Sequence, residues 1–208
     1  MNVVVVAGTG TEIGKTFVGA AVIHALREQG HTVIARKPAQ SFEETDTSTD
    51  ASVLGAASGE AAEAVCPKHR WYPVPMAPPM AAVALGRDPF SISDLVLETK
   101  RSFTTADVAL VETAGGSWSP QASDGLHVGD FAAQLRADAV LLVADAGLGV
   151  IHAVRGAAAA FADPPIVFLN RYDSGNGLHV ENRAWLAGHD KFTVVTSAAE
   201  AAVMLAAI

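Results

Sequence analysis

Continuous apolar runs of strand length recur along the chain and alternate with segments whose apolar residues fall at helical spacing. The runs predict strands over residues 3–7, 31–36, 108–112, 139–144 and 166–169, several of them apolar enough to be covered on both faces. The helical spacing predicts helices over 16–29, 51–57, 80–85 and 91–103, with Ser91 or Ser93 as the N-cap of the last. Strands that alternate with helices predict a doubly wound, mostly parallel α/β sheet, in one domain over residues 1–208.

Polar and glycine-rich segments interrupt this pattern at the ends of the predicted strands. Residues 39–50 form a polar, acidic loop, and residues 66–79 contain five prolines and are expected to be irregular surface or a lid. Residues 173–177 are expected to be a mobile loop. Because open parallel sheets bind ligands at the carboxyl ends of their strands, these turns are where we expect a site.

The run Gly8-Thr9-Gly10-Thr11-Glu12-Ile13-Gly14-Lys15-Thr16 lies between the first predicted strand and the first predicted helix. In this context backbone N–H groups turn toward one anion, Lys15 adds a point charge, and the Thr16 hydroxyl is a magnesium ligand. Five residues separate Gly8 from Gly14, one more than in the usual motif. The run predicts a phosphate-binding loop and a P-loop NTPase-like fold that binds a nucleoside triphosphate.

Two further strand ends carry charged residues. Lys37 ends the second strand, so we expect it to converge with Lys15 on one highly charged anion, with Ser41 nearby. Glu112 ends the third strand and is expected to bind Mg²⁺ together with Thr16 and a carboxylate of the acidic loop. For that carboxylate Asp50 is preferred to Asp46.

The net charge and the cysteine content indicate which binding partners and which cellular compartment to expect. The net charge of −8 and the pI near 5.2 argue against a nucleic-acid or anionic membrane surface. The single cysteine, Cys66, cannot form an internal disulfide, which favours a reducing cytoplasm. No apolar run reaches membrane-spanning length and no signal-peptide pattern precedes the first strand, so we expect a protein that is neither secreted nor membrane-embedded.

Taken together, the ordered motifs resemble the dethiobiotin synthetase family. The resemblance rests on the loop over residues 8–16, on Lys37-Pro38-Ala39-Gln40-Ser41, on Thr49-Asp50-Ala51 and on Val111-Glu112-Thr113-Ala114-Gly115-Gly116. It extends to residues 73–82 and 148–151 and covers most of the chain up to about Asn170. It implies a homodimeric ATP- and Mg²⁺-dependent cyclo-ligase that closes a cyclic urea on 7,8-diaminononanoate with CO₂, through a phosphorylated carbamate.

The resemblance also implies roles for individual residues. Lys37 would be catalytic, and Lys15 would steady the transferred phosphoryl group. Thr16, Asp50 and Glu112 would hold Mg²⁺. The substrate contacts would be Thr11, Ser41 and His152, and the nucleotide contacts would be Glu12, Ile13, Gly14, Lys15, Thr16, Phe17, Asp50, Glu112, Gly115 and Asn170, with Asn170 reading the adenine.

Several positions depart from the family pattern. Phe42 and Thr113 replace glycines, His152 replaces an asparagine that helps to seat the substrate, and Val194-Val195-Thr196-Ser197-Ala198 stands where a Gly-x-Ile-Pro stretch is expected. Three alternatives therefore stay open: a regulatory ATPase of the partitioning type, a related synthetase acting on another amine or carboxylate, and a nucleotide-binding relative without catalysis. The first is disfavoured because Thr9 and Gly10 stand where those proteins carry an additional lysine.

Overall fold

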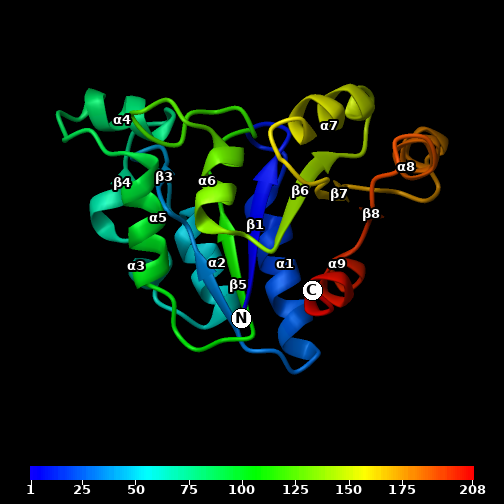
Figure 1. The fold of residues 1–208 in the computed structure, drawn as a ribbon, viewed down its shortest axis with the longest axis horizontal. Helices are drawn as coiled ribbons and strands as arrows, with labels where there is room; N and C mark the ends of the chain where they lie inside the picture. The colour runs from blue at the N-terminus through cyan, green and yellow to red at the C-terminus, as the bar shows by residue number, and fades with distance from the viewer.

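The computed structural model describes residues 1–208 and contains a six-stranded parallel sheet in the order β2-β5-β1-β6-β7-β8 (Figure 1). The strands are β1 (Asn2–Gly8), β2 (Val33–Arg36), β5 (Val108–Glu112), β6 (Ala139–Asp145), β7 (Ile166–Asn170) and β8 (Val194–Val195). Five of them begin and end within two residues of the predicted strands. The predicted doubly wound parallel fold is therefore confirmed.

Helices cover both faces of the sheet and enclose two separate hydrophobic cores. On one face, α1 (Lys15–Glu28), α2 (Asp50–Ser58) and α9 (Ala198–Ala206) pack on side chains such as Val4 and Val6. On the other, α5 (Ile92–Arg101), α6 (Val128–Leu135) and α7 (Val150–Ala158) pack on Val5 and Ala7. Successive residues of β1 thus face opposite cores, as the two-residue period of a strand requires.

Short elements occupy the segments that were expected to be irregular. β3 (Gln40–Ser41) pairs in parallel with β4 (Trp71–Tyr72), and between them lie α2, α3 (Ala62–Val65) and the 3₁₀ helix η1 (Lys68–Arg70). The prediction of a loop over 39–50 and of irregular structure over 66–79 is wrong at β3, η1 and β4. Strands of two residues carry too few positions for a periodic signal, so only the tertiary pairing reveals them.

The second half of the chain contains helices that the sequence pattern did not predict. These are α6, α7, α8 (Gly177–Gly188) and α9. Three of them begin at a side-chain cap, because His127, Asn176 and Ser197 each accept a hydrogen bond from the first turn of the helix that follows. The loop expected over 173–177 ends at the Asn176 cap.

The exposed side of the edge strand β2 is covered by polar groups. The Ala35 N–H donates to Glu60 Oε2 at 2.8 Å, and the Lys37 N–H donates to the Val65 carbonyl at 2.8 Å. The Arg36 guanidinium, which is 3% exposed, binds the same Glu60 carboxylate at 2.7 Å. These bonds use donors that would otherwise be free to pair with another strand, and they fix the direction in which the chain leaves β2 at Lys37.

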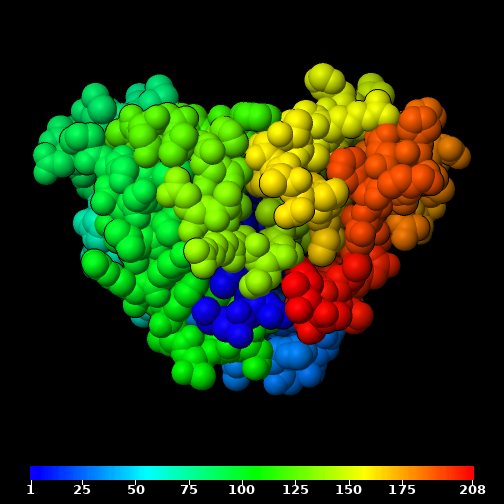
Figure 2. Space-filling model, viewed as in Figure 1, coloured from blue at the N-terminus to red at the C-terminus, as the bar shows by residue number.

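Because all six strands are parallel, their carboxyl ends lie along one edge, at the top of Figure 1. The helix α4 (Pro78–Ala84) lies at one end of this edge and α7 at the other. The surface is broadest here, with the segment around α4 and the helices α7 and α8 forming the two upper corners (Figure 2). None of the helices combines the length and the apolar character needed to cross a membrane.

Leu110 lies in the middle of β5, fully buried between β2 and β1, so shortening it should destabilise the fold. We expect Leu110→Ala to lower the free energy of unfolding by about 2–5 kcal/mol, measured by denaturant titration. Leu97→Ala on α5 is the matched control, because Leu97 is 51% exposed and its loss should cost less than about 0.5 kcal/mol. Equal losses would contradict the burial described here.

Candidate functional site

The loop between β1 and α1 has the backbone geometry of an anion-binding turn. Gly14 is the N-cap of α1 and adopts the left-handed conformation, with φ at 88°. Glu12 is also left-handed, with φ at 58°. The first turn of α1 therefore opens toward the carboxyl edge with N–H groups that no side chain caps.

Asn170, the last residue of β7, is hydrogen-bonded to this loop. Its Nδ2 donates to the Ile13 carbonyl at 2.8 Å, and its Oδ1 accepts from the Arg171 N–H at 3.0 Å. A Cβ added to Gly14 would overlap with Asn170 Nδ2. The loop conformation thus depends on glycine at position 14 for two reasons, its φ angle and its contact with Asn170.

A cavity of about 760 Å³ lies above the loop at the carboxyl edge of the sheet. Both lysines that the sequence singled out line it, Lys15 from α1 and Lys37 from the end of β2. The remaining lining residues are Thr11, Glu12, Gly14, Thr16, Ser41, Asp50, Pro75, Met76, Ala77, Pro78, Glu112, Ala114, Gly115 and Ser119. The proline-rich segment therefore borders the cavity, in the position expected for a lid.

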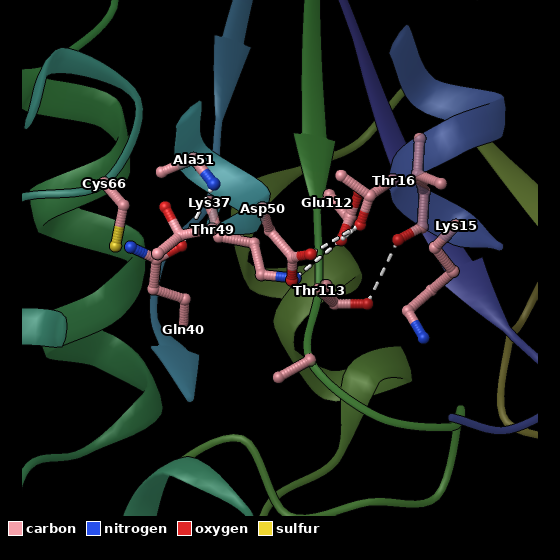
Figure 3. A network of polar contacts seen from close by, with 12 residues as sticks. Lys15, Thr16, Lys37, Gln40, Thr49, Asp50, Ala51, Cys66, Glu112 and Thr113 are labelled. Atoms are coloured by element: carbon pink, nitrogen blue, oxygen red, sulfur yellow. Dashed lines mark hydrogen bonds and ion pairs between the residues drawn. The ribbon is translucent and has the colours of Figure 1, made fainter. Parts of the chain in front are cut away.

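A compact charged cluster forms the floor of this cavity (Figure 3). Lys37 Nζ lies 2.6 Å from Asp50 Oδ2 and 2.6 Å from Glu112 Oε1. The Thr16 hydroxyl lies 2.8 Å from Asp50 Oδ1 and 3.0 Å from Glu112 Oε1. Four elements, β2, β5, α1 and α2, thus bring one ammonium, two carboxylates and one hydroxyl together.

Burial makes the charges of this cluster interdependent. Burial alone would lower the pKa of Lys37, but Glu112 and Asp50 outweigh it and raise that pKa above its ordinary value. Burial opposes ionisation of Asp50 as well, yet Lys37 holds the Asp50 pKa below its usual range. For Glu112, which is fully buried, burial and the nearby Asp50 raise the pKa. Lys37 and Asp50 therefore form the firmly charged pair.

The ammonium group of Lys15 has fewer polar contacts than that of Lys37. Lys15 Nζ donates to the Gly10 carbonyl at 3.0 Å and makes no ion pair. Burial and the positive charge of Lys37 lower the Lys15 pKa from 10.5 to about 8. A bound anion would favour the charged form of Lys15 and would itself be attracted to it.

The oxygen atoms of the cluster fit a magnesium ion. Mg²⁺ takes oxygen ligands, usually one or two carboxylates completed by phosphate and water. Asp50, Glu112 and Thr16 supply two carboxylates and a hydroxyl, and Glu112 Oε2 is buried with no hydrogen-bond partner. With only two acidic side chains, the remaining ligands of any ion would have to come from a bound molecule or from water.

A residue that sequence reasoning did not single out as functional, Gln40, links the segments that carry the cluster. Its Oε1 accepts from the Ala51 N–H at 3.0 Å, and Ala51 directly follows Asp50 at the start of α2. Gln40 is 1% exposed. Its place between Lys37 and Ser41 was the available signal, but its bond to α2 spans 11 residues and is visible only in the fold.

Comparison with known proteins identifies the family. A protein-family model described as an AAA domain matches residues 2–166 of the chain. The protein named ATP-dependent dethiobiotin synthetase BioD from Xanthomonas axonopodis pv. citri is 35% identical over 161 residues, which is 76% of this chain and 70% of that protein. The chain belongs to the dethiobiotin synthetase family.

Other dethiobiotin synthetases align over a similar part of the chain. Those of Rhodococcus erythropolis and Streptomyces coelicolor are 35% and 38% identical over 152 residues, 73% of this chain. The aligned part spans 66% and 62% of the length of these two relatives.

Solved structures with the same fold come from other functional classes. The signal recognition particle receptor FtsY of Elizabethkingia anophelis superposes with a TM-score of 0.55 at 15% identity, covering 94% of this chain and 57% of FtsY. A plasmid partition protein of Borrelia burgdorferi bound to AMPPNP gives 0.51 at 13% identity, covering 94% and 86%. At these identities the likeness shows the fold alone.

Four of the residues expected from the dethiobiotin synthetase pattern lie outside the cavity lining: Ile13, Phe17, His152 and Asn170. Phe17 lies in the first turn of α1 and is 71% exposed. His152 is exposed on α7. Ile13 and Asn170 support the phosphate loop from beneath. Asp46, the alternative metal ligand, is exposed and accepts from the Glu43 N–H at 3.0 Å.

The departures from the dethiobiotin synthetase pattern have local structural explanations. Thr113 is buried and its hydroxyl donates to the Val6 carbonyl at 3.1 Å, so its side chain joins β5 to β1. Phe42 packs edge-on against Trp71, with ring centroids 6.1 Å apart. Neither side chain lines the cavity. Val194 and Val195 form the edge strand β8.

Alanine at position 14 should destabilise the protein more than alanine at a comparable open glycine. Gly30 is the matched control, because its φ is 90° but a Cβ there would meet nothing within 4 Å. We expect Gly30→Ala to cost about 1–2 kcal/mol of unfolding free energy for its left-handed conformation. Gly14→Ala should cost about 1 kcal/mol more, because of the overlap with Asn170.

A double-mutant cycle with Asn170→Ala tests the cause of this difference. Removing the Asn170 amide should recover the extra loss of Gly14→Ala and leave the loss of Gly30→Ala unchanged. Additive losses at positions 14 and 170 would contradict the proposed contact. The measurement is denaturant unfolding of the single and double variants.

Proposed function

We propose that this chain is an ATP-dependent cyclo-ligase that forms the ureido ring of dethiobiotin from 7,8-diaminononanoate and CO₂. One observation carries the proposal: Lys15, Lys37 and a carboxylate pair converge on a single cavity beside a phosphate-binding loop. Its relatives bear the name ATP-dependent dethiobiotin synthetase. In the proposed reaction a carbamate anion attacks the ATP polyphosphate, and a concentration of positive charge stabilises that approach.

The proposed reaction has three steps. One substrate amine attacks CO₂ and loses a proton, which gives a carbamate. A carbamate oxygen attacks the γ-phosphorus of ATP, and ADP leaves. The second amine then attacks the carbamoyl carbon, loses a proton and expels inorganic phosphate, which closes the ring.

The residues of the cavity divide this work between two sets. The phosphate loop, from Glu12 to Phe17, would bind the nucleotide, with Lys15 beside the transferred phosphoryl group. Thr16, Asp50 and Glu112 would hold Mg²⁺, which supplies charge neutralisation for the phosphates when it is bound. Gly115, which lines the cavity, would contact the nucleotide, and Asn170, whose amide donates to the Ile13 carbonyl, would read the adenine as the family pattern implies.

The opposite wall would bind the diamine and its carbamate. Ser41 Oγ is buried and has no hydrogen-bond partner within the chain, so it is free to bind a polar substrate group. Thr11 offers a second hydroxyl across the cavity. Lys37 would be the catalytic lysine, because its ammonium group lies beside the carboxylates in the same cavity that Ser41 and Thr11 line, and a positive charge there is suited to an anionic carbamate.

We also propose that the enzyme works as a cytoplasmic homodimer. Leu148, just before α7, is 91% exposed, and Trp118, which is 55% exposed, donates to the Gly156 carbonyl of α7 at 2.8 Å. Both residues thus lie beside α7, the helix that carries His152. Contact with a second subunit through this surface would bury them and bring His152 toward the partner's cavity. The single buried thiol, Cys66, suits a reducing compartment.

Phosphate release tests the proposed activity. With ATP and Mg²⁺, release should depend on both 7,8-diaminononanoate and bicarbonate, and dethiobiotin should accumulate in equal amount, measured by mass spectrometry. Release that ignores the diamine would favour the regulatory ATPase instead. Absence of release with any diamine would favour a nucleotide-binding protein without catalysis.

Within this assay, Lys37→Ala should lower turnover by at least about 10²–10³-fold, because it removes the cation nearest the carbamate. Nucleotide binding, followed by calorimetry, should largely persist, since Lys15 and the loop remain. Lys68→Ala is the matched control, because its side chain is 72% exposed and lies on η1 away from the cavity. Full turnover by Lys37→Ala would remove Lys37 from the catalytic site.

Light scattering coupled to gel filtration tests the dimer. The chain should elute with twice its mass of 21.4 kDa, and Leu148→Asp should shift it toward the monomer because a charge would be buried at the interface. Val203→Asp on α9, where Val203 is 62% exposed, should leave the dimer unchanged. A monomeric wild type would contradict this part of the proposal.

A further inference from the structure

The ammonium group of Lys37 occupies the space between the two carboxylates that the proposed function assigns to Mg²⁺ (Figure 3). Its Nζ is 2.6 Å from one oxygen of Asp50 and 2.6 Å from one oxygen of Glu112. Lys37 is 2% exposed and Glu112 is fully buried. The same pair of side chains therefore serves a resident cation, contributed by the chain itself.

An ammonium group and a magnesium ion cannot share this position. Mg²⁺ binds carboxylate oxygens at about 2.0–2.1 Å and demands a near-octahedral shell, so an ion held by both Asp50 and Glu112 would need the position that the Lys37 ammonium group now occupies between them. Two cations within a few ångströms also repel each other strongly where water is largely excluded. The two cations must therefore bind alternately.

Lys15 does not take part in this competition. Its Nζ is bonded to the Gly10 carbonyl at 3.0 Å and contacts neither carboxylate. It adds positive charge to the same cavity without occupying the position between Asp50 and Glu112. Lys15 therefore serves as a control for Lys37. Both ammonium groups lie in the same cavity, but only that of Lys37 occupies the position between Asp50 and Glu112.

We propose that Lys37 is the competitor that sets the metal affinity of this site, and that metal binding displaces its ammonium group into the cavity. This inference rests on the proposed function. The four-carbon side chain of lysine is flexible, and Lys37 lines the cavity that Ser41 and Thr11 also line. Displacement would deliver the ammonium group to the wall where the carbamate is expected, so metal binding and substrate binding become thermodynamically linked.

The experiment measures thermal unfolding against Mg²⁺ concentration, without nucleotide or diamine, with Mn²⁺ as a second probe. Lys37→Met removes the competitor and leaves Asp50 and Glu112 without a counter-ion. We expect its melting temperature to fall in the absence of metal and to recover with Mg²⁺. Its half-saturating Mg²⁺ concentration should be at least about 10-fold lower than that of the wild type.

Two further variants separate competition from a general effect of charge. Lys15→Met removes the same charge from the same cavity, so it should show a much smaller gain in metal affinity than Lys37→Met. Lys37→Arg keeps the charge and can bind both carboxylates, so it should need at least as much metal as the wild type. If Lys37→Met folds only when Mg²⁺ or Mn²⁺ is present, that result supports the proposal.

Several outcomes would overturn it. Equal metal responses of Lys37→Met and Lys15→Met would reduce the effect to general electrostatics, and an unchanged metal affinity in Lys37→Met would remove the competition. If Lys37→Met does not fold under any condition, a Lys37→Arg protein that binds metal more tightly than the wild type would overturn it. Because the measurement contains no substrate, a failure of ring closure in the activity assay would overturn the proposed function separately.

Discussion

The mutual neutralisation of Lys37, Asp50 and Glu112 is the interaction on which the carboxyl edge of this protein depends. A buried carboxylate without a partner is costly, and so is a buried ammonium group. Each of these side chains is tolerated because the others are present, and the Thr16 hydroxyl supplies the remaining polar contact. The cluster thus holds charged groups at the floor of the cavity, where a charged ligand can bind to them.

The parallel sheet explains why this cluster can form. Lys37 leaves the end of β2 and Glu112 ends β5, and these strands are neighbours in the sheet. Thr16 enters from α1, which follows the adjacent strand β1, and Asp50 enters from α2, whose first turn is tied to Gln40. The edge bonds of β2 to Glu60 and Val65 set the exit of Lys37. The site therefore depends on contacts well outside the cavity.

Two of the positions where this chain departs from the dethiobiotin synthetase pattern, Phe42 and Thr113, lie outside the cavity lining but next to residues of that lining in the chain. Thr113 bonds to β1, and Phe42 packs on Trp71, beside the short β3–β4 pair. Such replacements change the packing around the cavity. The charged groups that line it are those that the family pattern predicts. His152 differs from both, because it is exposed on α7 and its surroundings would be completed by a second subunit under the proposed dimer.

The sequence by itself determined five of the six strands of the main sheet, the helices α1, α2, α4 and α5, the phosphate loop and the charged residues at the strand ends. Those features are local: apolar runs, a glycine-rich turn and a lysine before a proline are visible within a few residues. Only the tertiary structure decided that Lys37 pairs with both Asp50 and Glu112, that Gln40 ties α2 to β3, and that β3 and β4 exist. These contacts join residues far apart in the chain, and their energies arise from burial and charge pairing, which no local pattern of residues contains.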